Sequence, residues 1–142
     1  CAVVGGGAWC WGRGTAGELG NGAKQTSEAP VAVIGLDSNV STLEVAGGPD
    51  EGDATCAVRD GRVLCWGNGQ YGRLGDGGTA ARAAPVEVTT LPGPAKKLAG
   101  GFNHFCALLT SGEIRCWGRG TSGQLGDGTG QDRPVPVAVL GL

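Results

Sequence analysis

Six cysteines are the residues of this sequence whose chemistry is easiest to interpret, and they stand in three pairs nine or ten positions apart. They are Cys1, Cys10, Cys56, Cys65, Cys106 and Cys116. Zinc ligands usually stand two to four residues apart, and the single histidine, His104, has no partner for a metal site. Disulfides are therefore the leading interpretation, with buried free thiols and a zinc site as alternatives. Disulfides would indicate an oxidising compartment.

Three Gly-x-Gly-x-x-Gly strings, at residues 12–17, 67–72 and 118–123, would suggest dinucleotide binding if each stood alone. That fingerprint requires a strand before it, a helix after it and an acidic residue about 20 positions further on. Each string here is instead followed by Leu-Gly and a further turn. We therefore interpret the strings as glycine-rich bends between strands.

Catalytic motifs are sparse in this chain. It lacks the Gly-x-Ser-x-Gly, P-loop and His-Glu-x-x-His patterns. Asp76-Gly77 and Asp127-Gly128 resemble calcium loops only loosely, because the alternating acidic ligands are missing. We expect no enzyme activity, no cofactor and no bound metal, and we expect His104 to be structural.

Composition restricts the elements that can position these residues. The chain has 142 residues, 30 of them glycine, and glycine inside a helix costs about 1 kcal/mol relative to alanine. Eleven basic against thirteen acidic residues leave no positive surplus for a nucleic acid. No apolar run approaches the roughly 18 residues of a membrane span. The sequence thus predicts turns and short strands, without nucleic-acid binding or a membrane span.

Internal repeats organise the whole chain. Cys-Trp-Gly recurs with offsets of 55 and 51 residues, and Leu-Gly and Pro-Val-x-Val recur in phase with it. Each unit contains about four short β runs, which is typical of a propeller blade. The predicted division is a partial blade over 1–29, repeats over 30–84 and 85–135, and the first strand of a further blade over 136–142. The recurring Trp11, Trp66 and Trp117 are expected to pack blades together.

The hairpin register predicts the cysteine pairs. Asp60-Gly61 is a strong two-residue hairpin turn, and it places Cys56 directly opposite Cys65. That pair is a non-hydrogen-bonded one, in which side chains approach closely. Gly5-Gly6 does the same for Cys1 and Cys10. Cys106 and Cys116 require a three-residue turn over 110–112 with Gly112 at a positive φ.

Residues 106–108, 116–118 and 123–129 read Cys-Ala-Leu, Cys-Trp-Gly and Gly-Gln-Leu-Gly-Asp-Gly-Thr. This pattern resembles the regulator of chromosome condensation repeat, in its bacterial, cysteine-paired type. The resemblance implies an all-β propeller, usually of seven blades. Dividing 142 residues by about 52 gives about 2.7 units. We therefore expect an arc of a larger propeller, or a protomer that closes by self-association through its open edges.

The resemblance also implies a range of functions, because members of the family include a guanine-nucleotide exchange factor and a secreted inhibitor of β-lactamases. We predict a non-catalytic scaffold that presents its loops to an extracytoplasmic protein partner, secreted, periplasmic or on the cell surface. Exchange activity on a small GTPase and secreted enzyme inhibition are the alternatives. Loop residues that vary between the copies are the expected contacts. They are Arg13, Asn68, Tyr71, Phe102, Asn103 and Arg119, with further contacts in the longer loop at Pro49, Asp50, Glu51 and Asp53.

Overall fold

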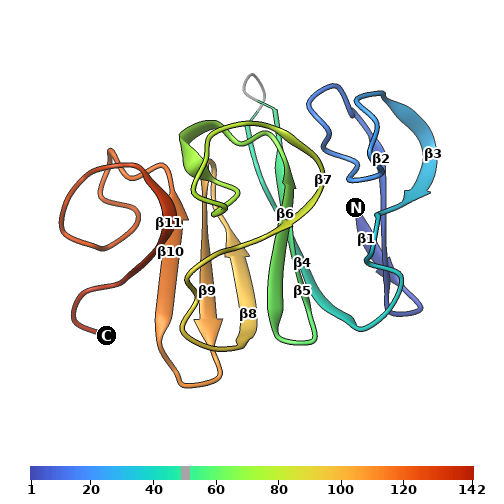
Figure 1. The fold of residues 1–142 in the computed structure, drawn as a ribbon. Coiled ribbons are helices and arrows are strands. Elements are labelled where there is room, and N and C mark those ends of the chain that lie inside the picture. Colours follow the sequence, from blue (N-terminus) through green and yellow to red (C-terminus); the bar gives the residue numbers. More distant parts are fainter. Residues whose placement is uncertain (49–51) are drawn as a thin grey trace.

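The computed structural model describes residues 1–48 and 52–142, so the predicted contacts Pro49, Asp50 and Glu51 lie outside the described residues. Within the described ranges, eleven strands form three antiparallel sheets that stand side by side along the chain (Figure 1). One turn of 3₁₀ helix, η1 (Gln70–Gly72), is the helical element of these ranges. The predicted all-β architecture is confirmed.

The strands follow the chain order within each sheet. The first sheet contains β1 (Ala2–Val4), β2 (Gly7–Gly12) and β3 (Ser27–Ala32). The second contains β4 (Val40–Ala46), β5 (Ala54–Arg59), β6 (Arg62–Gly67) and β7 (Arg82–Glu87). The third contains β8 (Ala95–Gly100), β9 (His104–Leu109), β10 (Ile114–Gly118) and β11 (Arg133–Ala138).

The sheets are offset from the repeats predicted from the sequence. The segment 136–142, expected to begin a further blade, contributes instead to β11, which pairs with β10 at the edge of the third sheet. Likewise Pro30-Val31 lies in β3 and pairs with β2. The reason is that Pro-Val-x-Val follows the Leu-Gly loop and returns beside the Cys-Trp-Gly strand of its own unit. Each sheet is therefore assembled from sequence that straddles the predicted repeat boundaries.

The hairpin turns have the predicted geometry. Asp60 and Gly61 both have positive φ, 50° and 78°, as a type I′ turn requires. In the third hairpin, the Leu109 N–H donates to the Glu113 carbonyl oxygen at 2.9 Å, and Gly112 has a φ of 95°. The turn therefore spans the three residues 110–112, and the strands leave it in the register that the sequence predicts.

The six cysteines are joined in the pairs that this register predicts, and each bond closes one hairpin. The bonds are Cys1–Cys10, Cys56–Cys65 and Cys106–Cys116, with Cα atoms 4.0, 4.1 and 4.1 Å apart. The second and third join β5 to β6 and β9 to β10, and the first joins Cys1, directly before β1, to β2. All three therefore fasten neighbouring strands of one sheet and leave the packing between sheets to other side chains.

The hydrophobic core lies between neighbouring sheets, and one tryptophan centres each interface. Trp66 from β6 packs with Leu19 and Val33, which follow strands of the first sheet. Trp117 from β10 occupies the equivalent interface between the second and third sheets, where its neighbours include Leu74 and Val88. Both tryptophans are fully buried. The prediction that Trp66 and Trp117 pack blades together is confirmed.

Each buried tryptophan donates a hydrogen bond to a loop of the preceding sheet. Trp66 Nε1 donates to the Glu18 carbonyl oxygen at 2.9 Å, and Trp117 Nε1 donates to the Arg73 carbonyl oxygen at 3.0 Å. A methyl group on the adjacent Gly20 would lie 2.8 Å from Trp66 Nε1, and Gly20 also has a φ of 65°. Glycine is therefore required there for both space and backbone conformation.

Trp11 differs from its two counterparts. Its neighbours Ala8 and Cys10 in β2 pack against the second sheet, so Trp11 projects from the opposite face of the first sheet. That face lies at the end of the row of sheets (Figure 1), and Trp11 is 47% exposed.

Candidate protein-binding loop face

The loops after β2, β6 and β10 gather at one end of the three sheets, opposite the hairpin turns (Figure 1). They cover residues 13–26, 68–81 and 119–132. We call the surface formed by these loops, together with residues 101–103, the loop face. Four of the six predicted contact residues lie in the first four positions after Trp-Gly, where the middle copy differs from the other two.

The first and third loops share one turn. The Ala16 N–H donates to Glu18 Oε2 at 2.7 Å, and the Ser122 N–H donates to Gln124 Oε1 at 2.9 Å. In each loop a side-chain oxygen two residues ahead satisfies a backbone donor, which fixes the turn. Arg119 Nε also donates to Thr121 Oγ1 at 3.3 Å. These two loops are therefore built in the same way.

The middle loop has a different conformation because Arg73 stands where the others have Glu18 and Gln124. A guanidinium group has no acceptor oxygen, so it cannot make the same turn. Instead Asn68 Oδ1 accepts from the Gln70 N–H at 2.9 Å, and the chain forms η1. Within this turn Tyr71 has a φ of 62° and a ψ of 10°. A left-handed conformation costs a non-glycine residue about 1–2 kcal/mol.

Two guanidinium groups lie over the Tyr71 ring. The Arg119 Cζ is 5.1 Å from the Tyr71 ring centroid, and the Arg73 Cζ is 5.9 Å from it. Arg73 is fully buried, and its Nη1 donates to the Gly52 carbonyl oxygen at 3.2 Å. Arg119 is partly exposed and comes from the loop of the third sheet. The structure thus brings together two of the predicted contact residues from different sheets, as a cation–π pair on the loop face.

The remaining predicted contacts are spread over the loop face. Arg13 is exposed and lies 3.7 Å from Glu18, measured from Nε to Oε1. Phe102 is 55% exposed, and its ring lies against Gly48. Asn68 is partly buried and supports the middle turn through its side chain.

The expectation that the Asn103 side chain contacts a partner is wrong for this structure, because that residue is only 1% exposed. Its carbonyl oxygen accepts from the Arg119 N–H at 2.9 Å. Asp53 has the same role in the previous sheet, where its carbonyl oxygen accepts from the Asn68 N–H. Asn103 is therefore a buried residue of the loop face, and its backbone carbonyl holds Arg119 in place.

In the two Asp-Gly turns of the loop face, the aspartate carboxylates bind to neighbouring groups of the same loop and of the strand that follows it. Asp127 Oδ1 accepts from the Thr129 N–H at 3.1 Å, and Asp127 Oδ2 lies 2.7 Å from Arg133 Nε. The hydrogen bond from Arg133 and the one from the Thr129 backbone hold the pKa of Asp127 below its usual value. Asp76 repeats the pairing with Arg82 at 2.8 Å. In the described ranges, no cluster of three or more His, Cys, Asp or Glu is placed to hold a metal ion.

His104 is half-buried at the start of β9, with its ring over Gly101. Burial lowers the pKa of the imidazole, so the neutral form is favoured. A substituent on Gly101 would collide with this ring, which explains the glycine at that position. The imidazole has a packing role here.

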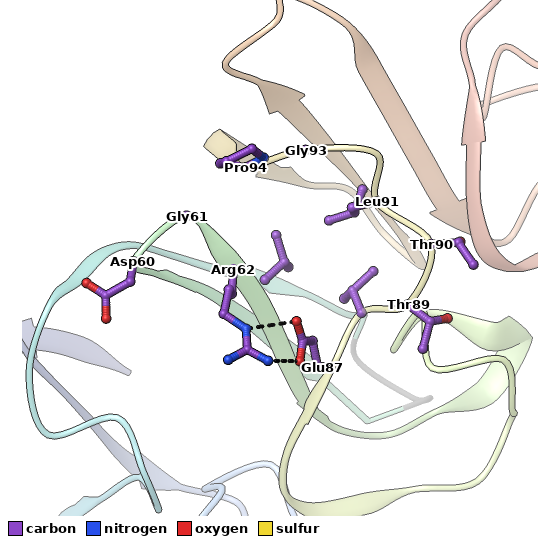
Figure 2. Close-up of a pocket in the computed structure, with 11 residues that line it drawn as sticks. Asp60, Gly61, Arg62, Glu87, Thr89, Thr90, Leu91, Gly93 and Pro94 are labelled. Carbon is purple, nitrogen blue, oxygen red and sulfur yellow. Dashed lines mark hydrogen bonds and ion pairs between the residues drawn. The ribbon is translucent and has the colours of Figure 1, made fainter.

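A hollow that the sequence analysis did not predict lies at the end of the sheets opposite the loop face. It measures about 460 Å³ and lies between the β5–β6 turn and the segment that leads from β7 to β8 (Figure 2). Arg62 and Glu87 meet in it through two side-chain hydrogen bonds, one of them 2.9 Å long from Nε to Oε1. Their mutual hydrogen bonding raises the pKa of Arg62 and lowers that of Glu87. Arg62 and Glu87 are thus already paired with each other, whereas the loop face presents an aromatic ring and a cation.

No helix among the described residues has the length and apolar character needed to cross a membrane. The arrangement of sheets and loops defines a class: an arc of β-propeller blades, fastened by one disulfide in each hairpin. The Regulator of chromosome condensation (RCC1) repeat model matches residues 5–50, 60–108 and 111–142, and a second RCC1 repeat model matches residues 95–124. The chain belongs to the RCC1 repeat family.

Curated relatives match nearly the whole chain. The human E3 ubiquitin-protein ligase HERC2 is 32% identical over 135 residues, which cover 94% of this chain and 3% of HERC2. The ultraviolet-B receptor UVR8 of Arabidopsis thaliana is 34% identical over 132 residues, 91% of this chain and 29% of UVR8. The chain therefore spans less than a third of either relative.

Solved structures show the same fold. Human WBSCR16 superposes with a TM-score of 0.77 at 24% identity, covering 94% of this chain and 33% of that one. Prp20p from Saccharomyces cerevisiae superposes with a TM-score of 0.75 at 24% identity, covering 94% and 34%. These likenesses confirm the β-propeller architecture.

Proposed function

We propose that this chain is a non-catalytic binding module whose loop face contacts an extracytoplasmic protein partner, with Tyr71 and Arg119 at the centre of the contact. Tyrosine and arginine are favoured anchors of protein interfaces, because each combines a large apolar area with specific polar groups. The pair lies where the two loops approach, 5.1 Å apart from Arg119 Cζ to the Tyr71 ring centroid.

The observation that carries the proposal is the left-handed backbone of Tyr71, with a φ of 62°. The equivalent positions of the other two loops are Ala16 and Ser122, and neither has a positive φ. The fold can thus build this loop without strain, yet in the middle sheet it holds a tyrosine in a strained conformation. Strained residues of this kind cluster at binding sites, where the surroundings fix one side-chain position.

The location outside the cytoplasm rests on the cysteines. All six lie in the described ranges and all are bonded. Disulfides persist in secreted, periplasmic and cell-surface proteins and are rare where thiols are kept reduced. Three bonds that each close one hairpin favour a chain that folds and works in an oxidising environment.

A protein partner is favoured over a catalytic role by what the loop face offers. The pair at its centre, Tyr71 and Arg119, offers an aromatic ring and a guanidinium group, two groups that are enriched at protein interfaces. Prp20p is described with binding to Gsp1p and histones, and yeast RCC1 (Prp20) as bound by Kap60. At 24% and 23% identity these likenesses show a shared fold and do not identify a partner for this chain. Exchange activity therefore stays the alternative, together with inhibition of a secreted enzyme.

The test is capture of proteins from the medium or periplasm of the producing cells on the immobilised, unreduced chain. Wild type is compared with Tyr71→Ala and Arg119→Ala, and with Arg62→Ala at the opposite end as the matched control. We expect one specific protein to be retained by wild type and Arg62→Ala, with at least about tenfold less retained by the two loop variants. Equal retention by all four chains would contradict the proposal. A captured GTPase or secreted enzyme would decide between the alternatives.

A further inference from the structure

Asn39 is the one asparagine of this chain whose side chain has no role in the fold. The chain has four asparagines. Asn21 and Asn68 each accept a hydrogen bond from the backbone N–H two residues ahead, at 3.1 and 2.9 Å, and Asn103 is buried. Asn39 is exposed, and within residues 1–48 and 52–142 its side chain has no hydrogen-bond partner. Its amide is therefore available to other molecules.

The backbone at this position does not demand an asparagine either. Asn39 has a φ of 60°, a conformation that asparagine tolerates. Directly after it, the Val40 N–H donates to the Gly6 carbonyl oxygen at 2.9 Å. The equivalent bond from Ala95 to the β5–β6 turn is 2.8 Å long and follows Pro94, whose ring excludes a positive φ. The fold thus builds the same connection without a left-handed residue.

The sequence around Asn39 gives the amide a chemical role. Residues 39–41 read Asn-Val-Ser, the acceptor sequence for N-glycosylation, which occurs in surface loops of secreted proteins. Asp37 stands two positions before Asn39, so the segment also meets the longer Asp-x-Asn-x-Ser form of the acceptor. The other three asparagines are followed two positions later by Ala, Gln and Phe, and the equivalent residues 94–96 read Pro-Ala-Lys. The acceptor is therefore particular to this one connection.

The structure leaves this segment open to solvent. Residues 37–39 are all exposed, and so is Ser41 at the start of β4. Ser41 Oγ donates to the Val58 carbonyl oxygen at 3.3 Å. Val58 lies in β5, later in the chain, so this bond forms only after the acceptor segment has been synthesised. The hydroxyl that the acceptor sequence requires is thus free in the nascent chain.

The position of Asn39 also suits a molecule that binds a partner through its loops. The connection from β3 to β4 lies at the end of the sheets that carries the hairpin turns, opposite the loop face (Figure 1). A glycan on Asn39 would extend from that end into solvent. It would leave Tyr71 and Arg119 uncovered.

We propose that Asn39 is an N-glycosylation site; this rests on the extracytoplasmic location proposed above. The donor is an oligosaccharide joined through its anomeric carbon to a lipid pyrophosphate. Asn39 Nδ2 forms a bond to that carbon, and the bond from the carbon to the pyrophosphate oxygen breaks. The lipid pyrophosphate leaves and takes up the proton that the amide loses. Ser41 is the acceptor hydroxyl that the transferase recognises.

The test is intact-mass spectrometry and peptide mapping of the unreduced chain recovered from the producing cells. Wild type is expected to carry one glycan, on the peptide that contains Asn39. Asn39→Gln and Ser41→Ala should each abolish it, whereas Ser41→Thr, which keeps the hydroxyl, should retain it. Asn21→Gln is the matched control and should be modified like wild type. Because Asn39 and Ser41 are exposed, these replacements leave no cavity in the core, and far-ultraviolet circular dichroism confirms that each variant is folded.

The outcomes separate this proposal from the function on which it rests. A chain recovered outside the cytoplasm, with its cysteines bonded and Asn39 unmodified, would overturn the glycosylation site and leave the location standing. A glycan that persists in Asn39→Gln or Ser41→Ala would also overturn it. A chain recovered only from the cytoplasm would overturn the location and the modification together. Partner capture by the loop face is measured independently of all these results.

Discussion

The indole Nε1 of Trp117 donates a hydrogen bond to the carbonyl oxygen of Arg73, 3.0 Å away and 44 residues earlier. The guanidinium group of the same Arg73 lies over the Tyr71 ring, with its Cζ 5.9 Å from the ring centroid. One residue therefore connects the packing between the second and third sheets to the loop face. The position of Tyr71 depends on the interface as well as on its own turn.

Loss of the indole donor should destabilise the interface more than the change in volume alone. Trp117→Phe leaves the buried Arg73 carbonyl without its donor, and we expect the free energy of unfolding to fall by about 1–3 kcal/mol. Trp117→Ala adds a cavity and should cost about 3–5 kcal/mol. Urea denaturation followed by circular dichroism measures both. A Trp117→Phe protein as stable as wild type would show that the hydrogen bond contributes nothing.

The backbone strain at Tyr71 can be isolated with two variants that both lack the ring. Tyr71→Ala keeps a side chain in the left-handed conformation, whereas Tyr71→Gly removes the steric conflict. We expect Tyr71→Gly to be about 1 kcal/mol more stable than Tyr71→Ala, because the left-handed conformation costs a non-glycine residue about that much. Urea midpoints of the two variants give the difference. The reverse order of stability would contradict a φ of 62° at this position.

Each disulfide should raise the free energy of unfolding, because it restricts the conformations of the unfolded chain. Cys56 and Cys65 are fully buried and close a loop with a sequence separation of 9. Loop-closure entropy for that length predicts a loss of about 2–3 kcal/mol when both are replaced by alanine. Reduction of the wild-type protein should lower the urea midpoint in the same direction. Full alkylation of all six cysteines in the native, unreduced protein would contradict the bonded pairs and the extracytoplasmic location together.

Stability should fall as the solution becomes acidic, in part through His104. Burial places its pKa in the folded protein below the unfolded value of about 6.5, so the unfolded state binds protons first. The contribution is therefore fully present above pH of about 6.5 and is lost as the pH falls through the folded pKa. His104→Gln should flatten the stability profile below a pH of about 6.5. Identical slopes in the two proteins would show that the imidazole does not titrate differently on folding.

The fold follows from short-range patterns that the sequence contains in three copies. Asp60-Gly61 and Gly112 determine their hairpins locally, so strand register and cysteine pairing could be predicted before the structure. The boundaries of the sheets could not be predicted, because a repeated sequence shows how far apart the units are and not where each unit begins. The pairing of β3 with β2, of β7 with β6 and of β11 with β10 shows that Pro-Val-x-Val closes each sheet.

The loop face could be predicted in outline but not in detail. Variation between copies drew attention to Tyr71 and Arg119, and the cation–π pair joins them. The left-handed Tyr71 had one signal in the sequence, the replacement of an acceptor side chain by Arg73, whose consequence depends on the hydrogen bonds of the whole turn. The burial of Asn103 could not be predicted, because asparagine residues are mostly exposed and nothing in the sequence marks this one as buried.

The central claim is that the loop face binds a protein partner at Tyr71. The most direct measurement places a photoreactive amino acid at Gln70, which is exposed beside Tyr71, and a second one at Ser111 in the hairpin turn at the opposite end. Irradiation in the medium or periplasm of the producing cells should give a discrete adduct from position 70 and none from position 111, and Arg119→Ala should abolish the adduct. Equal labelling from both positions, or an adduct that persists with Arg119→Ala, would contradict the account.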